Sequence, residues 1–260
     1  LIEENNLQFI EHNVEEIVEA DNIEIKFNIF ETEKILVNRI NVVGNNVTNE
    51  EVIRGELLLD EGDPFTEIKL DKSIASIKAR NIFRTVNKSV KDGSSSDLKI
   101  IDIRVEEQPT GEVSAGAGVG TDGGSFAFNV QENNWLGQGK EIGVELEITT
   151  DSVSGNLSYT DPNYDLLGNS LRYNISSTKN DKPDQGYENS IVTAGIGTSF
   201  EQYKDVFTRL ALYATHDDLR TSSSASSSLK KQKGKFSEIS GEYGFTYDQR
   251  NRKFAPTDGS

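Results

Sequence analysis

The sequence predicts an α+β region built from β-α-α-β-β repeats, followed by an all-β region of antiparallel strands long enough to cross a membrane. Two periodicities predict this division. Before Pro109, helical and strand patterns alternate in short units. After Pro109, Gly, Ser, Thr, Asn and aromatic residues dominate, and apolar residues recur at every second position. We therefore place the main domain boundary at Pro109.

Composition argues against several classes of function. The 260 residues carry 43 acidic and 27 basic side chains, so a surface that binds the phosphates of nucleic acid is not expected. The absence of cysteine removes disulfides, thiolate metal sites and cysteine nucleophiles. With two histidines and carboxylates that are typical of solvated faces, the sequence predicts no enzyme, metal or cofactor. No apolar run approaches the roughly 20 residues of a spanning helix, so we expect any membrane crossing to be made by strands.

Residues 35–109 are predicted to form one complete repeat. A strand over 35–43 precedes two helices, and strands over 83–90 and 98–107 follow them. Thr48 and Glu51 have the spacing of a capping box, which predicts that the first helix begins there and carries Val52, Ile53 and Leu57.

The second helix of this repeat is predicted to begin at Pro64-Phe65-Thr66. Leu70, Ile74 and Ile77 fall on one face of it. Asn81 is placed to end it in a left-handed conformation. Residues 1–34 have the pattern of the end of a preceding repeat, with a helix end at 1–5 and strands at 9–18 and 22–30. The sequence therefore indicates a repeat array.

The region after Pro109 is predicted to contain about eight strands, each of which reaches the roughly 9 to 11 residues that a tilted transmembrane strand needs. Compact turns at 136–139 and 201–204 alternate with polar loops at 179–186 and 218–234, which is typical of an outer-membrane barrel. A soluble β-sandwich is the alternative, although its strands are usually shorter. The predicted strands are 111–120, 124–135, 140–150, 153–161, 170–179, 190–200, 206–217 and 235–250.

Several motifs resemble one known family. The repeat is similar to a POTRA domain, with Phe65-Thr66 and Asn81-Ile82-Phe83 at matching places. Asn134-Trp135-Leu136-Gly137 resembles the N-W-L-G turn that follows the first barrel hairpin of the BamA family of outer-membrane assembly factors. Residues 254–260 resemble the family's F-P-T-D-G-S turn, with Ala255 as an insertion. Asn81 replaces a glycine that is frequent in the family, and Asn tolerates the same backbone region.

The resemblance implies a domain order and a function. Residues 1–34 would end a fourth POTRA domain, 35–109 would form the fifth, and 110–260 would form the first eight of sixteen barrel strands. The implied protein is the central, non-enzymatic subunit of a bacterial assembly machine. It receives unfolded outer-membrane proteins in the periplasm and inserts them into the outer membrane, with lipoprotein subunits and outer-membrane lipid as its other partners. No nucleic acid or cofactor is implied.

The strand over 111–120 is the main candidate site. A glycine inside regular structure costs roughly 0.5 to 1 kcal/mol relative to alanine, so three interior glycines predict a weak strand. With the resemblance, this strand is interpreted as a lateral gate that offers its open edge to an incoming strand. Glycines that fit a curved barrel wall are the alternative without the resemblance, and a phosphate-binding loop lacks the following helix and lysine. The gate residues are Val113, Gly116, Gly118, Val119 and Gly120.

Three further sites are predicted. Trp135, Leu136 and Gly137 form a turn whose indole would lie at the membrane interface, unless the tryptophan packs in a sandwich corner. Glu61 matches an acidic position at which the family docks a lipoprotein, although an exposed glutamate is usually only solvated. The strand that contains Thr85, Val86 and Asn87 is a candidate edge for an extended client peptide, or an edge whose polar residues keep it soluble.

Two other functions stay open at this stage. A two-partner secretion pore has the same architecture but exports a polypeptide through its lumen. A stand-alone eight-stranded porin, adhesin or membrane enzyme is also compatible with the strand count, because eight strands are enough to close a barrel.

Overall fold

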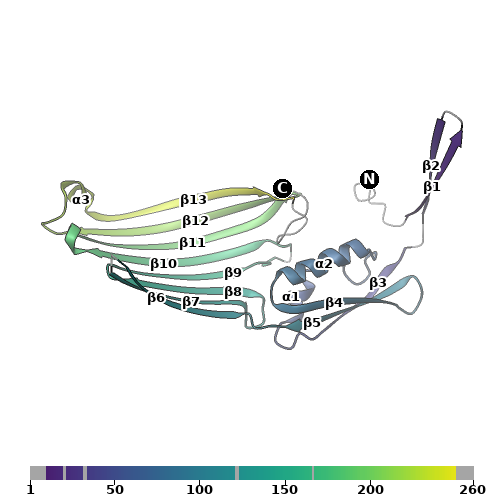
Figure 1. Cartoon of the computed structure of the whole chain (residues 1–260), viewed down its shortest axis with the longest axis horizontal. Helices are drawn as coiled ribbons and strands as arrows, with labels where there is room; N and C mark the ends of the chain where they lie inside the picture. Colours follow the sequence, from purple (N-terminus) through teal and green to yellow (C-terminus); the bar gives the residue numbers. More distant parts are fainter. Residues whose placement is uncertain (1–9, 20–21, 32–33, 121–122, 166, 250–260) are drawn as a thin grey trace. The chain divides into compact units, whose positions relative to one another are not determined.

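The computed structural model describes residues 10–19, 22–31, 34–120, 123–165 and 167–249 (Figure 1). Backbone contacts divide the chain into two compact units. The first comprises residues 1–46 and 56–108, and the second comprises residues 47–55 and 109–260. The division after residue 108 falls beside Pro109, whereas the assignment of the short segment 47–55 to the second unit has no counterpart in the sequence pattern. The predicted helix end at 1–5 and the motif at 254–260 lie outside the described residues.

The first unit contains a hairpin and all of the repeat except the segment with its first helix, which belongs to the second unit. Strands β1 (Ile10–Glu19) and β2 (Asn22–Glu31) pair in antiparallel fashion. The repeat has a three-stranded sheet in the order β3-β5-β4, in which β3 is parallel to β5 and β4 is antiparallel to it. These strands span Leu36–Val43 (β3), Phe83–Asp92 (β4) and Leu98–Glu107 (β5). With helices α1 (Glu50–Arg54) and α2 (Glu67–Ala79), the predicted β-α-α-β-β order is confirmed.

The core of the repeat lies between α2 and the sheet. Leu70, Ile74 and Ile77 of α2 are buried, as their i, i+4, i+7 spacing predicts. Alternate residues of β5 supply the sheet side of this core, because side chains one residue apart point to opposite faces of a strand. These buried β5 residues are Ile101, Ile103 and Val105.

Two local predictions for the repeat are corrected. Asn49, not Thr48, is the N-cap of α1, and the helix ends at Arg54, so Leu57 lies beyond it. Thr48 is not the cap of this helix, and its hydroxyl instead accepts a hydrogen bond from the Asn134 side chain. In β3 the register against β5 shifts between Val37 and Arg39, which is a β-bulge or a similar irregularity. Asn81 has φ of 56°, which confirms its left-handed conformation.

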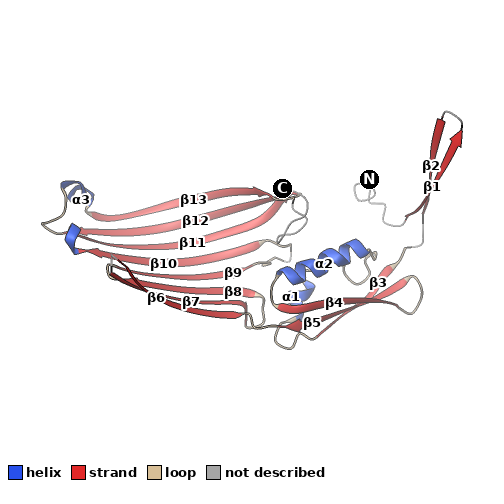
Figure 2. Ribbon diagram, viewed as in Figure 1, coloured by secondary structure: helices blue, strands red, loops and turns tan. Residues whose placement is uncertain are grey.

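The second unit contains one eight-stranded antiparallel sheet in the order β13-β12-β11-β10-β9-β8-β7-β6 (Figure 2). A 3₁₀ turn (Pro183–Gln185) and helix α3 (Ser227–Gln232) lie in two of its connections. The strands are β6 (Gly111–Gly120), β7 (Gly123–Trp135), β8 (Lys140–Thr149), β9 (Ser152–Asp161), β10 (Ser170–Lys182), β11 (Tyr187–Tyr203), β12 (Val206–Thr221) and β13 (Gly234–Tyr247).

Strands β10 to β12 are longer than predicted. Residues 179–182 and 218–221, which fall in the predicted polar loops, continue the ladder instead, with pairs such as Lys179↔Ser190 and Glu188↔Arg220. Glu188 faces the opposite charge of Arg220, and its carboxylate lies 3.0 Å from Lys179 Nζ; opposite charges across a sheet stabilise the pairing of strands. The connection between β12 and β13 is correspondingly shorter and contains α3.

The two faces of this sheet differ in polarity. Leu212, Ile239 and Phe245 expose 59%, 83% and 70% of their surface, and the register places them on the same face as many other exposed apolar residues. The opposite face carries Asn129, Glu145, Asn156, Arg172 and Tyr213, which line a hollow of about 320 Å³. The described residues of the second unit form a single sheet, so no second sheet of this unit covers its apolar face. The sandwich interpretation is therefore wrong, and an apolar face of this extent fits contact with lipid.

The core of the repeat generates the first prediction. Leu70→Ala should lower the free energy of unfolding of the repeat by roughly 2 to 5 kcal/mol, because it removes a fully buried side chain and leaves a cavity. Ile68→Ala is the control: Ile68 is 56% exposed on the same helix, and its loss should change stability by no more than about 0.5 kcal/mol. Pulse proteolysis of the intact protein in urea measures both. Equal effects would contradict the packing described here.

Candidate functional site

Strand β6 is an edge strand along its whole length. Among the described strands it pairs with β7 alone, and all ten of its residues are exposed. Val113 and Val119 are 68% and 94% exposed, and both fall on the apolar face. An edge strand presents a row of unpaired N–H and C=O groups, which is a template for another strand.

The glycines of β6 line its other face. Gly116, Gly118 and Gly120 alternate along the strand and therefore share the polar face. An added Cβ would meet nothing within 4 Å at Gly116 or Gly120, and at Gly118 only the Ser125 hydroxyl oxygen, at 3.1 Å. Gly116 borders a hollow of about 420 Å³. Close packing therefore does not require glycine at Gly116 or Gly120 among the described residues, and the barrel-wall explanation is weaker than the sequence suggested.

The two ends of β6 differ in how firmly they are held. At its last residues the partners on β7 are also small: Gly120 faces Gly123, Val119 faces Gly124 and Gly118 faces Ser125. Cross-strand side-chain pairs contribute roughly 0.2 to 1 kcal/mol each, so this end has little stabilisation beyond backbone hydrogen bonds. The glycines on the β7 side were missed by the sequence reasoning, because the register that opposes them is a property of the folded hairpin.

Residues 110–114, which we call the root of β6, comprise Thr110 and the first residues of the strand. Glu132 of β7 binds the beginning of this segment. Its Oε1 accepts hydrogen bonds from the Thr110 hydroxyl and from the Asn134 backbone N–H, the latter at 2.8 Å. The Asn133 N–H donates to the Thr110 carbonyl at 3.3 Å. Gly111 faces Glu132 in the register, and a Cβ there would lie 2.9 Å from the carboxylate. The beginning of β6 is thus held by polar side-chain hydrogen bonds, whereas residues 118–120 at its end face only small residues of β7.

The turn after β7 contains the predicted interface residues. Trp135 ends the strand and is 44% exposed, and Leu136 is 71% exposed. Leu136 and Gly137 both have positive φ, of 54° and 72°. A Cβ at Gly137 would lie 2.1 Å from the Val47 carbonyl oxygen, so only glycine fits at this close approach of two backbones.

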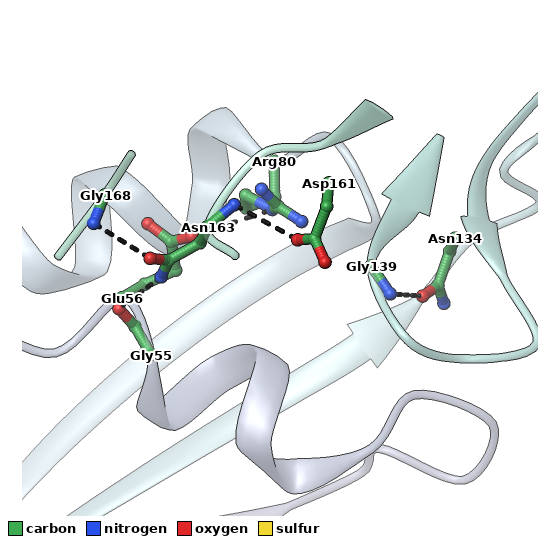
Figure 3. A network of polar contacts seen from close by, with 8 residues as sticks. All are labelled: Gly55, Glu56, Arg80, Asn134, Gly139, Asp161, Asn163 and Gly168. Carbon is green, nitrogen blue, oxygen red and sulfur yellow. Dashed lines mark hydrogen bonds and ion pairs between the residues drawn. The ribbon is translucent and has the colours of Figure 1, made fainter. Parts of the chain in front are cut away.

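Segment 47–55 is bonded to this turn inside the second unit. The Asn134 side chain donates from Nδ2 to Thr48 Oγ1 at 2.9 Å. It also accepts from the Gly139 N–H at 2.7 Å (Figure 3). Both Asn134 and Thr48 are buried. The Asn49 N–H donates to the Gly137 carbonyl at 2.8 Å.

A second asparagine repeats this arrangement after β9. The Asn163 side chain accepts from the Gly168 N–H at 2.8 Å and donates to the Gly55 carbonyl at 3.0 Å (Figure 3). In both turns the amide oxygen binds the N–H five residues later, and the amide nitrogen reaches segment 47–55. Figure 3 also draws the ion pair between Arg80 and Glu56 of the repeat, at 3.7 Å.

Glu61 has a structural contact in addition to its exposure. Its Oε1 accepts the Ile40 backbone N–H of β3 at 3.0 Å. Gly62 donates to the Val37 carbonyl at 2.7 Å, and Val37 donates to the Asp63 carbonyl at 2.8 Å. Residues 61–63 therefore bond to the edge of β3 that does not face β5. Glu61 is more than a solvated side chain, and a test of its role in docking must preserve this hydrogen bond.

Strand β4 is the other edge of the repeat's sheet, as its candidate role requires. Thr85 and Asn87 are exposed, whereas Val86 is buried, so only its backbone is available to a peptide. On the face with Thr85, Lys91 donates to Asp102 of β5 at 2.6 Å. The hydrogen bonds from Lys91 and then from Asn41 hold the pKa of the Asp102 carboxyl below its usual value. Client binding at this edge stays a prediction.

Two kinds of feature are absent from the described residues. No helix among them has the length and hydropathy to span a membrane. No group of three or more His, Asp or Glu side chains within them is arranged to hold a metal ion.

Comparisons with known proteins match each region of the chain to a known domain family. Residues 35–108 match the POTRA family of surface-antigen repeats, and residues 134–260 match the Omp85 superfamily domain. The outer membrane protein assembly factor BamA of Neisseria meningitidis is 28% identical over 188 residues, which are 72% of this chain and 22% of that protein. BamA of Nitratidesulfovibrio vulgaris is 26% identical over 254 residues, covering 92% of this chain and 30% of that protein.

Solved structures agree in fold. BamA of Haemophilus ducreyi lacking POTRA domains 1–3 has a TM-score of 0.65 at 24% identity, over 95% of this chain and 51% of that one. CdiB of Acinetobacter baumannii has a TM-score of 0.57 at 11% identity, over 95% of this chain and 48% of that one. The chain spans less than a third of these two curated relatives and about half of each of these solved chains.

The fold and these matches define the class of protein: a POTRA repeat joined to barrel strands of the Omp85 superfamily. Within that class, the matches support a BamA-type outer-membrane assembly factor, because curated BamA proteins are similar to this chain over most of its length.

The close approach at Gly137 generates the second prediction. Gly137→Ala should release segment 47–55 from the turn for two reasons. The new Cβ would clash with the Val47 carbonyl oxygen, and an alanine at this positive φ would carry backbone strain of about 1 to 3 kcal/mol. Hydrogen exchange of the intact protein in lipid should show faster exchange over 47–55. Gly62→Ala is the control, since Gly62 also has positive φ but no atom within 4 Å of its Cβ. Unchanged exchange over 47–55 in Gly137→Ala would show that the approach is not needed for docking.

Proposed function

We propose that the intact protein folds client β-barrel proteins into the outer membrane and that β6 is its lateral gate. The observation that carries this proposal is the weakly held end of β6, where Gly118, Val119 and Gly120 face only small residues of β7, in a strand of membrane-spanning length with an apolar outer face and a glycine-lined inner face. The curated relatives are named as outer membrane protein assembly factors, which supports the same activity here. The repeats would lie in the periplasm and β6–β13 in the outer membrane.

The mechanism follows from backbone hydrogen bonding. A client strand in hydrocarbon leaves N–H and C=O groups unpaired, at a cost of several kcal/mol each. The free edge of β6 would pair with these groups by β-augmentation, while the client's apolar face enters lipid. The glycines at Gly116, Gly118 and Gly120 weaken the competing closed state by about 1.5 to 3 kcal/mol in total. Pairing and lipid burial supply the free energy, so no nucleotide is needed.

Three partners are proposed with this function. Unfolded outer-membrane proteins would be clients of β6, with the edge of β4 at Thr85, Val86 and Asn87 as an earlier contact in the periplasm. Lipid contacts the apolar face of the sheet, and Trp135, Leu136 and Gly137 mark its periplasmic interface. A lipoprotein subunit would dock at Glu61.

A polypeptide-secretion pore of the same architecture is the second candidate. The fold similarity to CdiB supports it, with a lower TM-score and lower identity than the similarity to BamA. Such a pore would move its substrate through the lumen, so it needs no opening at β6. This difference separates the two functions experimentally.

A crosslink at the gate is the third prediction. In the intact protein, a disulfide from Val119→Cys to a cysteine in the strand that closes against β6 should block insertion of a model client into liposomes, and reductant should restore it. The control is a disulfide between Val119→Cys and Gly124→Cys, which face each other within the β6–β7 hairpin and leave the outer edge of β6 free. Full insertion with the gate crosslink formed would reject the gate and favour the pore.

The fourth prediction concerns Glu61. Glu61→Gln removes the charge but keeps an oxygen that accepts the Ile40 N–H, so it should weaken co-purification of the lipoprotein partner while the repeat stays folded. Glu61→Ala removes both and should also loosen the edge of β3, because the Ile40 N–H loses its partner. Co-purification and proteolysis of the repeat separate the two effects. Normal co-purification with Glu61→Gln would exclude docking through charge.

A further inference from the structure

Segment 47–55 and the root of β6 are joined by an unbroken series of polar contacts. Thr48 Oγ1 accepts from the Asn134 side chain, and the Asn134 backbone N–H donates to Glu132 Oε1. The same carboxylate oxygen accepts from the Thr110 hydroxyl, immediately before β6. All four residues belong to the second unit.

Asn134 is the residue on which this series depends. Its amide group is buried and hydrogen-bonded at both ends, with Nδ2 donating to Thr48 and Oδ1 accepting from the Gly139 N–H. Loss of the Thr48 hydroxyl would leave the Nδ2 donor buried without that acceptor, and an unsatisfied buried donor costs more than a normal hydrogen bond contributes. A shift of the turn would expose this donor to another partner. The same shift would disturb Glu132, because the Asn134 backbone N–H donates to its carboxylate.

We propose that segment 47–55 is a strap that holds the root of β6 in register, with Asn134 as the positioning residue between them. When the strap is docked, Glu132 is oriented to bind Thr110, and β6 is fixed at its root while its glycine-rich end is free to respond to a client. When the strap undocks, the root loosens as well. This inference rests on the proposed gate function of β6 and adds to it a means of control at the base of the strand.

Asn163 provides an internal comparison. It holds the other end of the same segment through the Gly55 carbonyl, at 3.0 Å, and its turn joins β9 to β10. None of its described hydrogen bonds leads to Glu132 or Thr110. If segment 47–55 affected β6 only through being attached to the sheet, loss of either asparagine would loosen the root of β6 to the same extent.

The test is hydrogen exchange of the intact protein in lipid nanodiscs, read over residues 47–55 and 110–114. Thr48→Val removes the hydroxyl at constant shape and should speed exchange in both segments by roughly tenfold. Thr48→Ser keeps the hydroxyl and should behave as wild type. Asn163→Ala should speed exchange over 47–55 and leave 110–114 unchanged. Glu132→Ala should speed exchange over 110–114 and leave 47–55 protected.

A double-mutant cycle decides whether the contacts act as one series. The effects of Thr48→Val and Glu132→Ala on exchange over 110–114 should be less than additive, because both break the same connection. Additive effects, or equal effects of Thr48→Val and Asn163→Ala on 110–114, would overturn the strap. Neither outcome would alter the result of the Val119 crosslink, so failure of the strap is distinguishable from failure of the gate.

Discussion

The constraint on which the rest of the second unit depends is the pairing of backbone polar groups in a medium without water. Hydrocarbon offers no partner for an N–H or C=O group, so each strand must be paired on both sides. Among the described strands, six of the eight meet this requirement within the sheet, and β6 and β13 each pair on one side only. The apolar face of the sheet fits contact with lipid, and the proposed gate would use the outer edge of β6 to pair with another strand.

The glycines of β6 act through the same constraint. Because Gly116 and Gly120 have open space beside them, their effect is to remove side-chain contacts rather than to relieve crowding. Backbone pairing is then the main stabilisation left at that end of the strand. The root is stabilised differently, by Glu132 and its polar partners. A strand that is fixed at one end and weakly held at the other suits a gate that must open without leaving the sheet.

Polar side chains that bind backbone groups recur where elements end. Glu61 occupies the Ile40 N–H on β3, and Asn134 and Asn163 occupy glycine N–H groups in two turns. Each of these residues can also make a second interaction. The Glu61 side chain is at the surface, where a partner can reach it, and both asparagines donate from their amide nitrogen to segment 47–55. Residues of this kind support structure and interaction together, so substitutions must separate the two.

The sequence by itself determined the repeat order, the buried face of α2 and the alternation of the barrel strands, because these follow from periodicities within one element. It also marked the glycines of β6 and the turn at Trp135. Only the tertiary structure showed that Thr48 binds Asn134, that Glu61 binds Ile40 and that Gly124 faces Val119. These contacts join residues that no local pattern relates: Thr48 and Asn134 are 86 positions apart, and Thr48 had a plausible local role as a helix cap. Strand register and long-range hydrogen bonding decided between a helix-capping role for Thr48 and its bond to Asn134. The physical reason is that a buried hydroxyl must be hydrogen-bonded, and the folded chain places the Asn134 amide beside it.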